Sequence, residues 1–202
     1  MEELPANFVA QVKAAVPGLM ELDLRSNALE VVPQGLQELT GLRVVRLNYN
    51  KIRTIPAELY QLERLQVLEL SGNLIESLPE EIEDLVRLRE LDVSGNKLTA
   101  LPDYILGLES LQNLVAENNA IETLPEDMHL LKSLTRFDVS TNKITRLPPS
   151  MGALPKLQSI DVSSNSLKTI PATLGRCKSI RQMDVRYNDL DETYKAKSEE
   201  GV

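Results

Sequence analysis

The residues of this chain that could perform chemistry are few, and they lie far apart in the sequence. The 202 residues include one histidine, His129, and one cysteine, Cys177, so neither a histidine-rich metal site nor a thiolate cluster can form. The carboxylates Asp138, Asp161 and Asp184 recur at a fixed spacing and could imitate a general acid and base. We expect them on an open face that does not exclude water. The sequence therefore predicts a protein that is not an enzyme and that holds no metal or other cofactor.

The fixed spacing of those carboxylates is 23 residues, and the same period runs through most of the chain. One repeat reads L-x-x-L-x-L-x-x-N-x-L-x-x-L-P-x-x-L-x-x-L-x-x, with positions counted from its first leucine, which is Leu19 in the first repeat. Every leucine slot holds an apolar residue, counting Cys177 and Ala116, although only 42% of the chain is hydrophobic. The asparagines of the period are Asn27, Asn50, Asn73, Asn96, Asn119, Asn142, Asn165 and Asn188.

The pattern within one repeat predicts a strand, a turn and a convex segment. Positions 3 to 7 alternate outward and inward, which is typical of a short strand, and one strand per repeat gives a parallel sheet. The asparagine after the strand carries amide donors and an acceptor, so we expect it to bond the backbone of its own and a neighbouring repeat. The proline suits the first turn of a helix. We predict an α/β solenoid, a curved right-handed coil with a parallel β-sheet on its concave face and short helices or 3-10 turns on its convex face.

The two ends of the array need covers, because a repeat stack exposes apolar faces at its termini. We expect a short helix over residues 6–16, with Phe8, Val9, Val12 and Val16 on one stripe. At the other end Tyr194 folds back over the last repeat, or that edge is open. The predicted divisions are residues 1–18 as an N-terminal helical cap, 19–190 as eight repeats, and 191–202 as a polar C-terminal tail or partial cap.

The repeat resembles the leucine-rich repeats of the Ras-group type, a 23-residue class with Leu/Ile-Pro at the start of the convex segment. The prolines that carry this resemblance recur from Pro33 to Pro171 without a break. A 22-residue class found in phosphatase-regulating proteins usually lacks that proline. The resemblance implies an intracellular scaffold or adaptor that binds other proteins, with a small GTPase or a phosphatase subunit as the suggested partner type. A regulatory or targeting module of a larger multidomain enzyme is the alternative.

The overall charge limits the classes of partner. The formal net charge is −8 and no basic cluster is evident, which argues against nucleic acid and anionic membranes. No run of about 18 apolar residues exists, so we expect no membrane insertion. The first five residues lack the features of a secretory signal, and a single cysteine fits a reducing compartment. We expect a cytoplasmic protein that is a monomer on its own.

Charges on the convex segments follow a common polarity. Acids such as Glu80 and Glu81 follow the proline, whereas bases such as Arg64 and Arg87 come at the far end of the segment. This arrangement matches a helix dipole. We expect these charges to form a solvated convex face and not a binding site. In the sixth repeat, Pro148 and the next proline favour a more extended convex segment.

The outward side chains of the concave face do not pack in the core. Position 5 of the repeat carries a stripe of carboxylates on this face. A basic partner would relieve the repulsion between neighbouring carboxylates, although aspartate is also common at this position in the family. Val44, Arg46, Tyr49 and Val67 form a second candidate cluster, because tyrosine and arginine are frequent interface anchors. The predicted protein-binding residues are Val44, Arg46, Tyr49, Val67, Glu69, Asp92, Val115, Glu117, Arg136, Asp138, Asp161, Asp184, Arg186 and Tyr187.

The fifth repeat departs from the pattern on both faces of its strand. Ala116 takes a core slot, while Val115 and Glu117 face outward where a charge and a serine are usual. Drift in a tolerant repeat and a partner-specific contact are both consistent with these substitutions.

Overall fold

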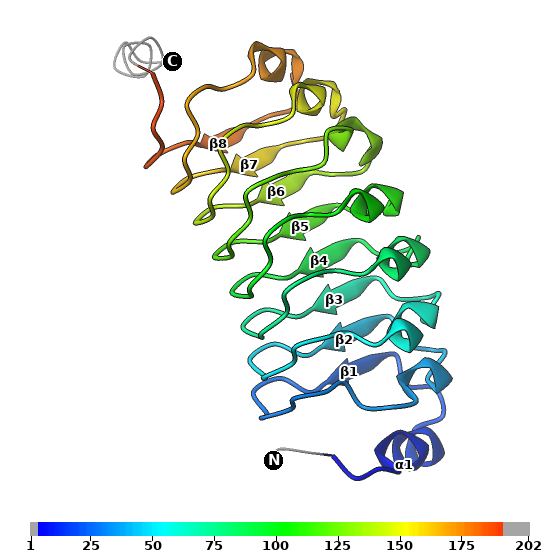
Figure 1. The fold of residues 1–202 in the computed structure, drawn as a ribbon. Coiled ribbons are helices and arrows are strands. Elements are labelled where there is room, and N and C mark those ends of the chain that lie inside the picture. Colours follow the sequence, from blue (N-terminus) through cyan, green and yellow to red (C-terminus); the bar gives the residue numbers. More distant parts are fainter. Residues whose placement is uncertain (1–3, 192–202) are drawn as a thin grey trace.

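The computed structural model describes residues 4–191, which form a single stacked coil (Figure 1). One α-helix, α1 (Phe8–Ala15), precedes the first strand. The strands are β1 (Glu21–Asp23), β2 (Val44–Arg46), β3 (Val67–Glu69), β4 (Glu90–Asp92), β5 (Asn113–Val115), β6 (Arg136–Asp138), β7 (Ser159–Asp161) and β8 (Gln182–Asp184). The 3-10 helices between them are η1 (Leu36–Glu38), η2 (Ala57–Gln61), η3 (Glu80–Asp84), η4 (Asp103–Gly107), η5 (Met128–Leu130), η6 (Pro149–Ala153) and η7 (Ala172–Arg176).

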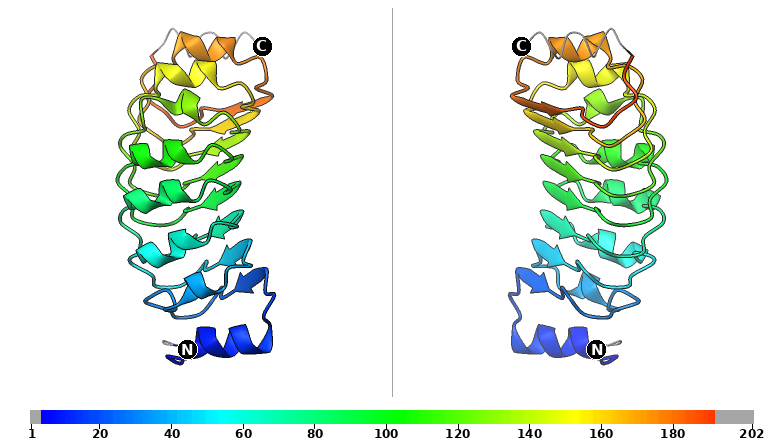
Figure 2. Two further views of the ribbon diagram at one scale, coloured as in Figure 1. Left: turned by 90° about the vertical axis from the view of Figure 1, so that its right-hand side faces the viewer. Right: turned by 90° about the vertical axis from the view of Figure 1, so that its left-hand side faces the viewer.

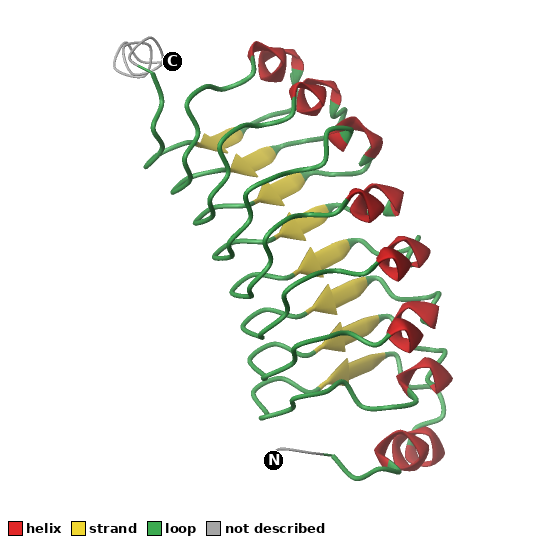
Figure 3. Cartoon of the chain, in the orientation of Figure 1, coloured by secondary structure: helices red, strands yellow, loops and turns green. Residues whose placement is uncertain are grey.

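The strands form one parallel sheet in the order β1 to β8, as the period predicts. Each residue pairs with the residue 23 positions later, as Leu22 does with Val45. The strands are three residues long and not five. The ladder of backbone hydrogen bonds nevertheless continues beyond them, since the amides of Leu24 and Ser26 donate to carbonyls of the next repeat. The 3-10 helices stack along the opposite side of the coil (Figures 2 and 3). The predicted solenoid is confirmed, and the sheet face directed away from the 3-10 helices is the concave face.

The space between the sheet and the 3-10 helices holds one continuous apolar core. All leucine slots of the repeat between Leu22 and Leu167 are buried, and Cys177 fills its slot as a buried residue. Among residues 4–191, the slots that are not fully buried lie at the two ends of the array, where the outermost described repeats pack against one neighbour. Met183 in β8, expected to point inward to the core, is 39% exposed.

The asparagines tie consecutive repeats together, as predicted from their amide groups. The amide nitrogen of Asn73 donates to the carbonyls of Leu70 in its own repeat and Leu47 in the preceding one, and its oxygen accepts from the amide of Ile52. The same pattern recurs at every later asparagine of the period through Asn188. Asn27 lies in the first repeat, and its amide nitrogen donates to the carbonyls of Leu24 and Arg25 in that same repeat. The turn after each strand is therefore held by a side chain that spans two repeats.

The convex segments correct two expectations. The repeat proline precedes the 3-10 helix as an extended residue, at Pro56, Pro79 and Pro102, and does not lie in its first turn. The sixth convex segment is a regular five-residue 3-10 helix, with Pro149 as its first residue, and is not extended. Proline has no N–H to lose at this position, so the second proline is accommodated.

The N-terminal helix caps the first repeat with part of the predicted stripe. Val9 is buried, and Phe8 and Val12 pack against the core. Val16 is 48% exposed, which contradicts its expected place on the stripe, because α1 ends at Ala15 and the chain turns away. Tyr194 lies outside the described residues.

Candidate interaction surface on the concave sheet

The position 5 carboxylates in the middle of the sheet are bound within their own strands. Asp161 accepts hydrogen bonds from the backbone amide and the hydroxyl of Ser163 at 3.0 and 2.7 Å. The same two bonds join Asp92 to Ser94 and Asp138 to Ser140. Asp138 is itself buried and also pairs with Arg136 at 3.2 Å. The stripe therefore has a structural role, since each carboxylate closes the turn after its strand.

The two ends of the stripe are neutralised in a different way, by arginine at position 7. Arg25 donates to both carboxylate oxygens of Asp23, and Arg186 does the same for Asp184. These hydrogen bonds lower the pKa of both aspartates below the ordinary value. Arg186 and Tyr187 remain exposed at the C-terminal end, where Tyr187 is 79% exposed.

Glu117 is the exception among the central carboxylates. No described residue forms a hydrogen bond or ion pair with its side chain, which projects from the strand ends amid Asp92, Asp138 and Asp161. Partial loss of hydration raises the pKa of Glu117, and the negative charges of these aspartates raise it further, against a smaller opposing effect of Arg136. The concave face thus has a centre of uncompensated negative charge. Val115, half-buried beside it, pairs in register with Asp92 and Asp138.

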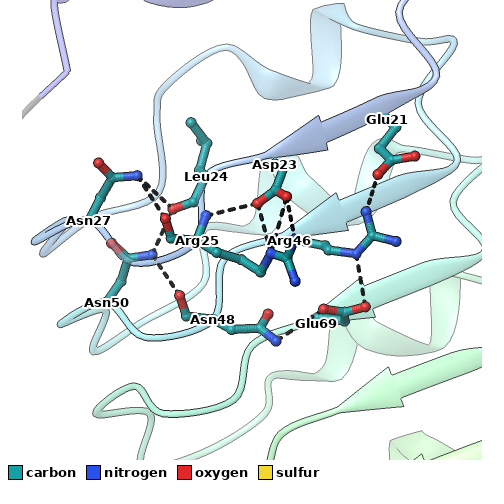
Figure 4. A network of polar contacts seen from close by, with 9 residues as sticks. All are labelled: Glu21, Asp23, Leu24, Arg25, Asn27, Arg46, Asn48, Asn50 and Glu69. Atoms are coloured by element: carbon teal, nitrogen blue, oxygen red, sulfur yellow. Dashed lines mark hydrogen bonds and ion pairs between the residues drawn. The ribbon is translucent and has the colours of Figure 1, made fainter.

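The N-terminal third of the face is a closed polar network (Figure 4). Arg46 bridges Glu21 of β1 and Glu69 of β3, and its contact with Glu69 is 3.0 Å. The amide nitrogen of Asn48 donates to the other oxygen of Glu69 at 3.0 Å. Arg46 and Glu69 therefore satisfy each other, and a partner would have to displace these bonds to use either residue. Sequence reasoning missed Glu21 and Asn48, whose pairing depends on contacts across three strands.

The predicted cluster around Val44 is only partly brought together. Val44 and Val67 are half-buried register partners. Tyr49 lies five residues further along the chain, in the turn after β2. Its ring lies over Gly72, where an added Cβ would be 2.7 Å from the tyrosine Cδ1. Tyr49 is 65% exposed and has a left-handed φ of 58°, so it is a separate exposed side chain at the other end of the strands and not part of the Val44 cluster.

Two family profiles match nearly the whole sequence. One, described as a leucine-rich repeat region, matches residues 80–200. The other, described as leucine rich repeat, matches residues 17–75 and 40–98. The chain belongs to the leucine-rich-repeat family. Comparison with curated proteins found no match.

Three solved structures show which leucine-rich-repeat proteins the chain is similar to. A leucine-rich-repeat protein of Leptospira interrogans has a TM-score of 0.74 and 27% identity, covering 98% of this chain and 61% of that chain. The ectodomain of the Arabidopsis thaliana membrane receptor kinase GASSHO1/SCHENGEN3, solved in complex with CASPARIAN STRIP INTEGRITY FACTOR 2, has a TM-score of 0.70 and 27% identity, covering 96% and 27%. An internalin of Listeria monocytogenes has the same fold, with a TM-score of 0.73 and 23% identity, covering 82% and 47%.

Leucine-rich repeats are in general non-catalytic modules that bind other proteins. The chain spans 61% or less of the length of each of these three neighbours. Within residues 4–191, no group of three or more metal-ligating side chains is placed to hold an ion. None of the described helices has the length and apolar character needed to cross a bilayer. The Cys177 thiol is buried against the Met151 carbonyl at 3.1 Å, and burial raises its pKa.

The charge crowding at the centre of this leucine-rich-repeat sheet predicts a pH-dependent effect of Glu117→Gln. Because the folded state raises the pKa of Glu117, it binds the proton more tightly than the unfolded chain does. The stability that the Glu117 carboxyl contributes is therefore fully present below its ordinary pKa of 4.5. It is lost as the pH rises through the pKa of the folded protein. Glu117→Gln should melt at a higher temperature than the wild type at pH 7, and the gap should close towards pH 4.5.

Circular dichroism melting at a series of pH values checks this expectation. Glu122→Gln is the matched control, because Glu122 is an exposed glutamate of the same repeat that lies outside the sheet. A Glu117→Gln protein that melts below the wild type at pH 7 would show that the carboxylate is stabilised there.

Proposed function

We propose that this chain is a non-catalytic scaffold or adaptor that binds a partner protein on its concave face, with a basic segment of the partner over Glu117. The observation that supports this most is the unpaired carboxyl of Glu117 among three bound carboxylates. An arginine or lysine placed there would relieve the repulsion without breaking any hydrogen bond that holds the strands together. The exposed anchors Tyr49 and Tyr187 would extend the contact on either side.

The rigidity of the scaffold favours this mode of binding. The asparagine ladder and the Asp-x-Ser bonds fix the strand ends before a partner arrives. A preorganised face loses little conformational entropy on association. We assign the contact with the partner to Glu117 and Tyr187, which are exposed, whereas the ion pairs of Arg46 with Glu69 and of Arg136 with Asp138 would hold the face in shape.

The finer parts of the proposal rest on the resemblance to the Ras-group repeat. We place the chain among these intracellular adaptors, with a cytoplasmic location, a monomeric state and a small GTPase or phosphatase subunit as partner. In this proposal residues 1–18 are the N-terminal cap and residues 19–190 the binding array, while the expected tail or partial cap of residues 191–202 lies almost wholly outside the described residues. A regulatory module within a larger enzyme is a second candidate, because the receptor-kinase ectodomain, itself part of a kinase, has this fold.

Charge reversal at Glu117 tests the proposal. Wild-type protein, Glu117→Arg and the control Glu122→Arg would each be immobilised and exposed to a cell lysate at low and at physiological salt. We expect partners retained by the wild type and the control to be lost from Glu117→Arg, and the retention to weaken with salt. Each captured partner would then be purified for titration.

The control makes the outcome decisive, because both variants change the net charge equally within the same repeat. Partners that are retained equally by wild type and Glu117→Arg would place the binding surface away from the centre of the sheet. Equal loss from both variants would indicate an effect of bulk charge and not of the concave face.

A further inference from the structure

Four arginines gather on one edge of the coil, outside the concave face. Arg43, Arg64, Arg87 and Arg89 lie in the connections that lead from η1, η2 and η3 into the next strands, β2, β3 and β4. Figure 3 shows these connections as the loops between the helical turns and the strand starts. All four side chains are exposed, and none of them forms an ion pair within the described part of the chain. We call this group the arginine edge.

The backbone ladder accounts for the closeness of the arginine edge. The Gln66 amide donates to the Arg43 carbonyl, and the Arg89 amide donates to the Gln66 carbonyl. Arg43 and Arg89 are therefore two strands apart, about 10 Å at the usual strand spacing. Arg64 and Arg87 are at position 23 of consecutive repeats. The sequence suggested no basic cluster, because the residues come from three repeats, and this expectation is corrected by the fold.

The expected helix-dipole role is wrong for Arg64 and Arg87, although Arg176 does lie in the last turn of η7. The 3-10 helices η2 and η3 end at Gln61 and Asp84 and have no basic residue in their last turn. Arg64 and Arg87 lie three residues beyond those ends. They are therefore not placed to neutralise the helix ends, and their charges remain unpaired.

Two shallow hollows lie beside the arginine edge and share Thr40, Gln61 and Glu63. The first, about 560 Å³, is lined by Arg43 and Arg64 together with Met20, which is 55% exposed. The second, about 700 Å³, is lined by Arg87, Asp84 and Val86, which is 56% exposed. Each hollow thus combines a guanidinium group with an exposed apolar side chain. Glu63 and Asp84 offset part of the positive charge without pairing with the arginines.

The second hollow also contains buried polar atoms that lack a partner. The Tyr60 hydroxyl and the Gln37 side-chain oxygen form no hydrogen bond with any described residue, and both residues line this hollow. Tyr60 is only 2% exposed. An unpaired buried donor or acceptor costs free energy. Both atoms are shielded from solvent, so a ligand in the hollow would reach them only after neighbouring side chains move, and they do not decide which ligand binds.

From these observations we propose that the arginine edge is a second protein-binding surface, which takes an acidic peptide segment with interspersed apolar residues. Arginine binds carboxylates through paired hydrogen bonds, and Met20 and Val86 would contact the apolar side chains between them. The partner is a peptide and not a nucleic acid, because the hollows present exposed apolar side chains, Met20 and Val86, and have no exposed aromatic side chain for base stacking.

A variant built from residues that the chain already uses tests the proposal. Positions 2 and 23 hold glutamine and serine in other repeats, as at Gln66 and Ser110, so Arg43→Gln, Arg64→Ser, Arg87→Ser and Arg89→Gln are combined. The probe is a fluorescent peptide of alternating glutamate and leucine, measured by fluorescence anisotropy at low salt. We expect the wild type to bind it and the variant to bind at least about tenfold more weakly.

The matched control removes four positive charges from the opposite edge of the coil. Lys51→Ala, Lys97→Ala, Lys143→Ser and Arg53→Thr likewise use residues found at those positions in other repeats. This control should bind the peptide within about twofold of the wild type. If the arginine-edge variant does not fold, Arg43→Gln and Arg87→Ser are measured singly, and each should weaken binding about threefold.

Several results would overturn the proposal. One is a wild-type protein that does not bind the peptide. Another is an equal loss in the control, which would mean that only bulk charge matters. A single-stranded oligonucleotide that binds with the same arginine dependence would replace the peptide as the ligand. The outcome at Glu117 is independent, because none of these substitutions touches the concave face.

Discussion

Asn73→Ala should lower the free energy of unfolding by about 3 kcal/mol or more, because it orphans buried backbone groups in two repeats. The side chain is buried and bonds the carbonyls of Leu47 and Leu70 and the amide of Ile52, all near 3.0 Å. Alanine can replace none of these bonds, and the stability of a repeat array depends on each interface between neighbours. Urea unfolding followed by circular dichroism measures the loss.

Asn27→Ala is the matched control for Asn73→Ala. Asn27 occupies the same position of the first repeat, but it bonds only the Leu24 and Arg25 carbonyls of its own turn and remains half-buried. Its removal should cost clearly less, about 1 kcal/mol. Equal losses at the two positions would mean that the bonds between repeats contribute little to stability.

Gly152→Ala should destabilise the protein by about 3 kcal/mol through steric overlap. A Cβ at residue 152 would lie 2.3 Å from the carbonyl oxygen of Thr173 and 2.6 Å from its Cβ. Thr173 cannot move away freely, because its hydroxyl donates to the Pro149 carbonyl at 2.7 Å. The methyl group would therefore separate η6 from η7. Thermal and urea unfolding give the size of the effect.

Gly175→Ala supplies the comparison, since Gly175 holds the same repeat position one repeat later. A Cβ there meets nothing within 4 Å. The substitution should be neutral or stabilise by about 0.5 kcal/mol, because alanine restricts the unfolded chain. A Gly152→Ala protein as stable as Gly175→Ala would show that a methyl group fits between η6 and η7.

The repeat period alone was enough to predict the architecture. The residues that define it act within one repeat, or between the same position of two neighbouring repeats. The apolar slots and the asparagines are of this kind, and the sheet, the core and the ladder follow from them. Val16 was misjudged because α1 ends one residue before it, and Met183 because it lies in β8, which pairs within the described residues only with β7. Strand length was overestimated because alternation continues beyond the residues that pair on both sides.

The candidate surface was predicted less well, because its chemistry depends on which side chains pair. The Asp-x-Ser spacing, as in Asp161 and Ser163, is a local signal that could have revealed the bound carboxylates. The bridge from Arg46 to two strands and the gathering of the arginine edge depend on contacts between different repeats. Rotamers and register decide these contacts, and the period does not encode them.

The affinity of Glu117→Gln for a partner captured by the wild-type protein tests the proposed concave site most directly. The substitution keeps the shape of the side chain and removes only its charge. We predict that it weakens binding at low salt by about tenfold while the protein melts at a higher temperature at pH 7. An affinity that equals that of the wild type would contradict a basic contact at Glu117.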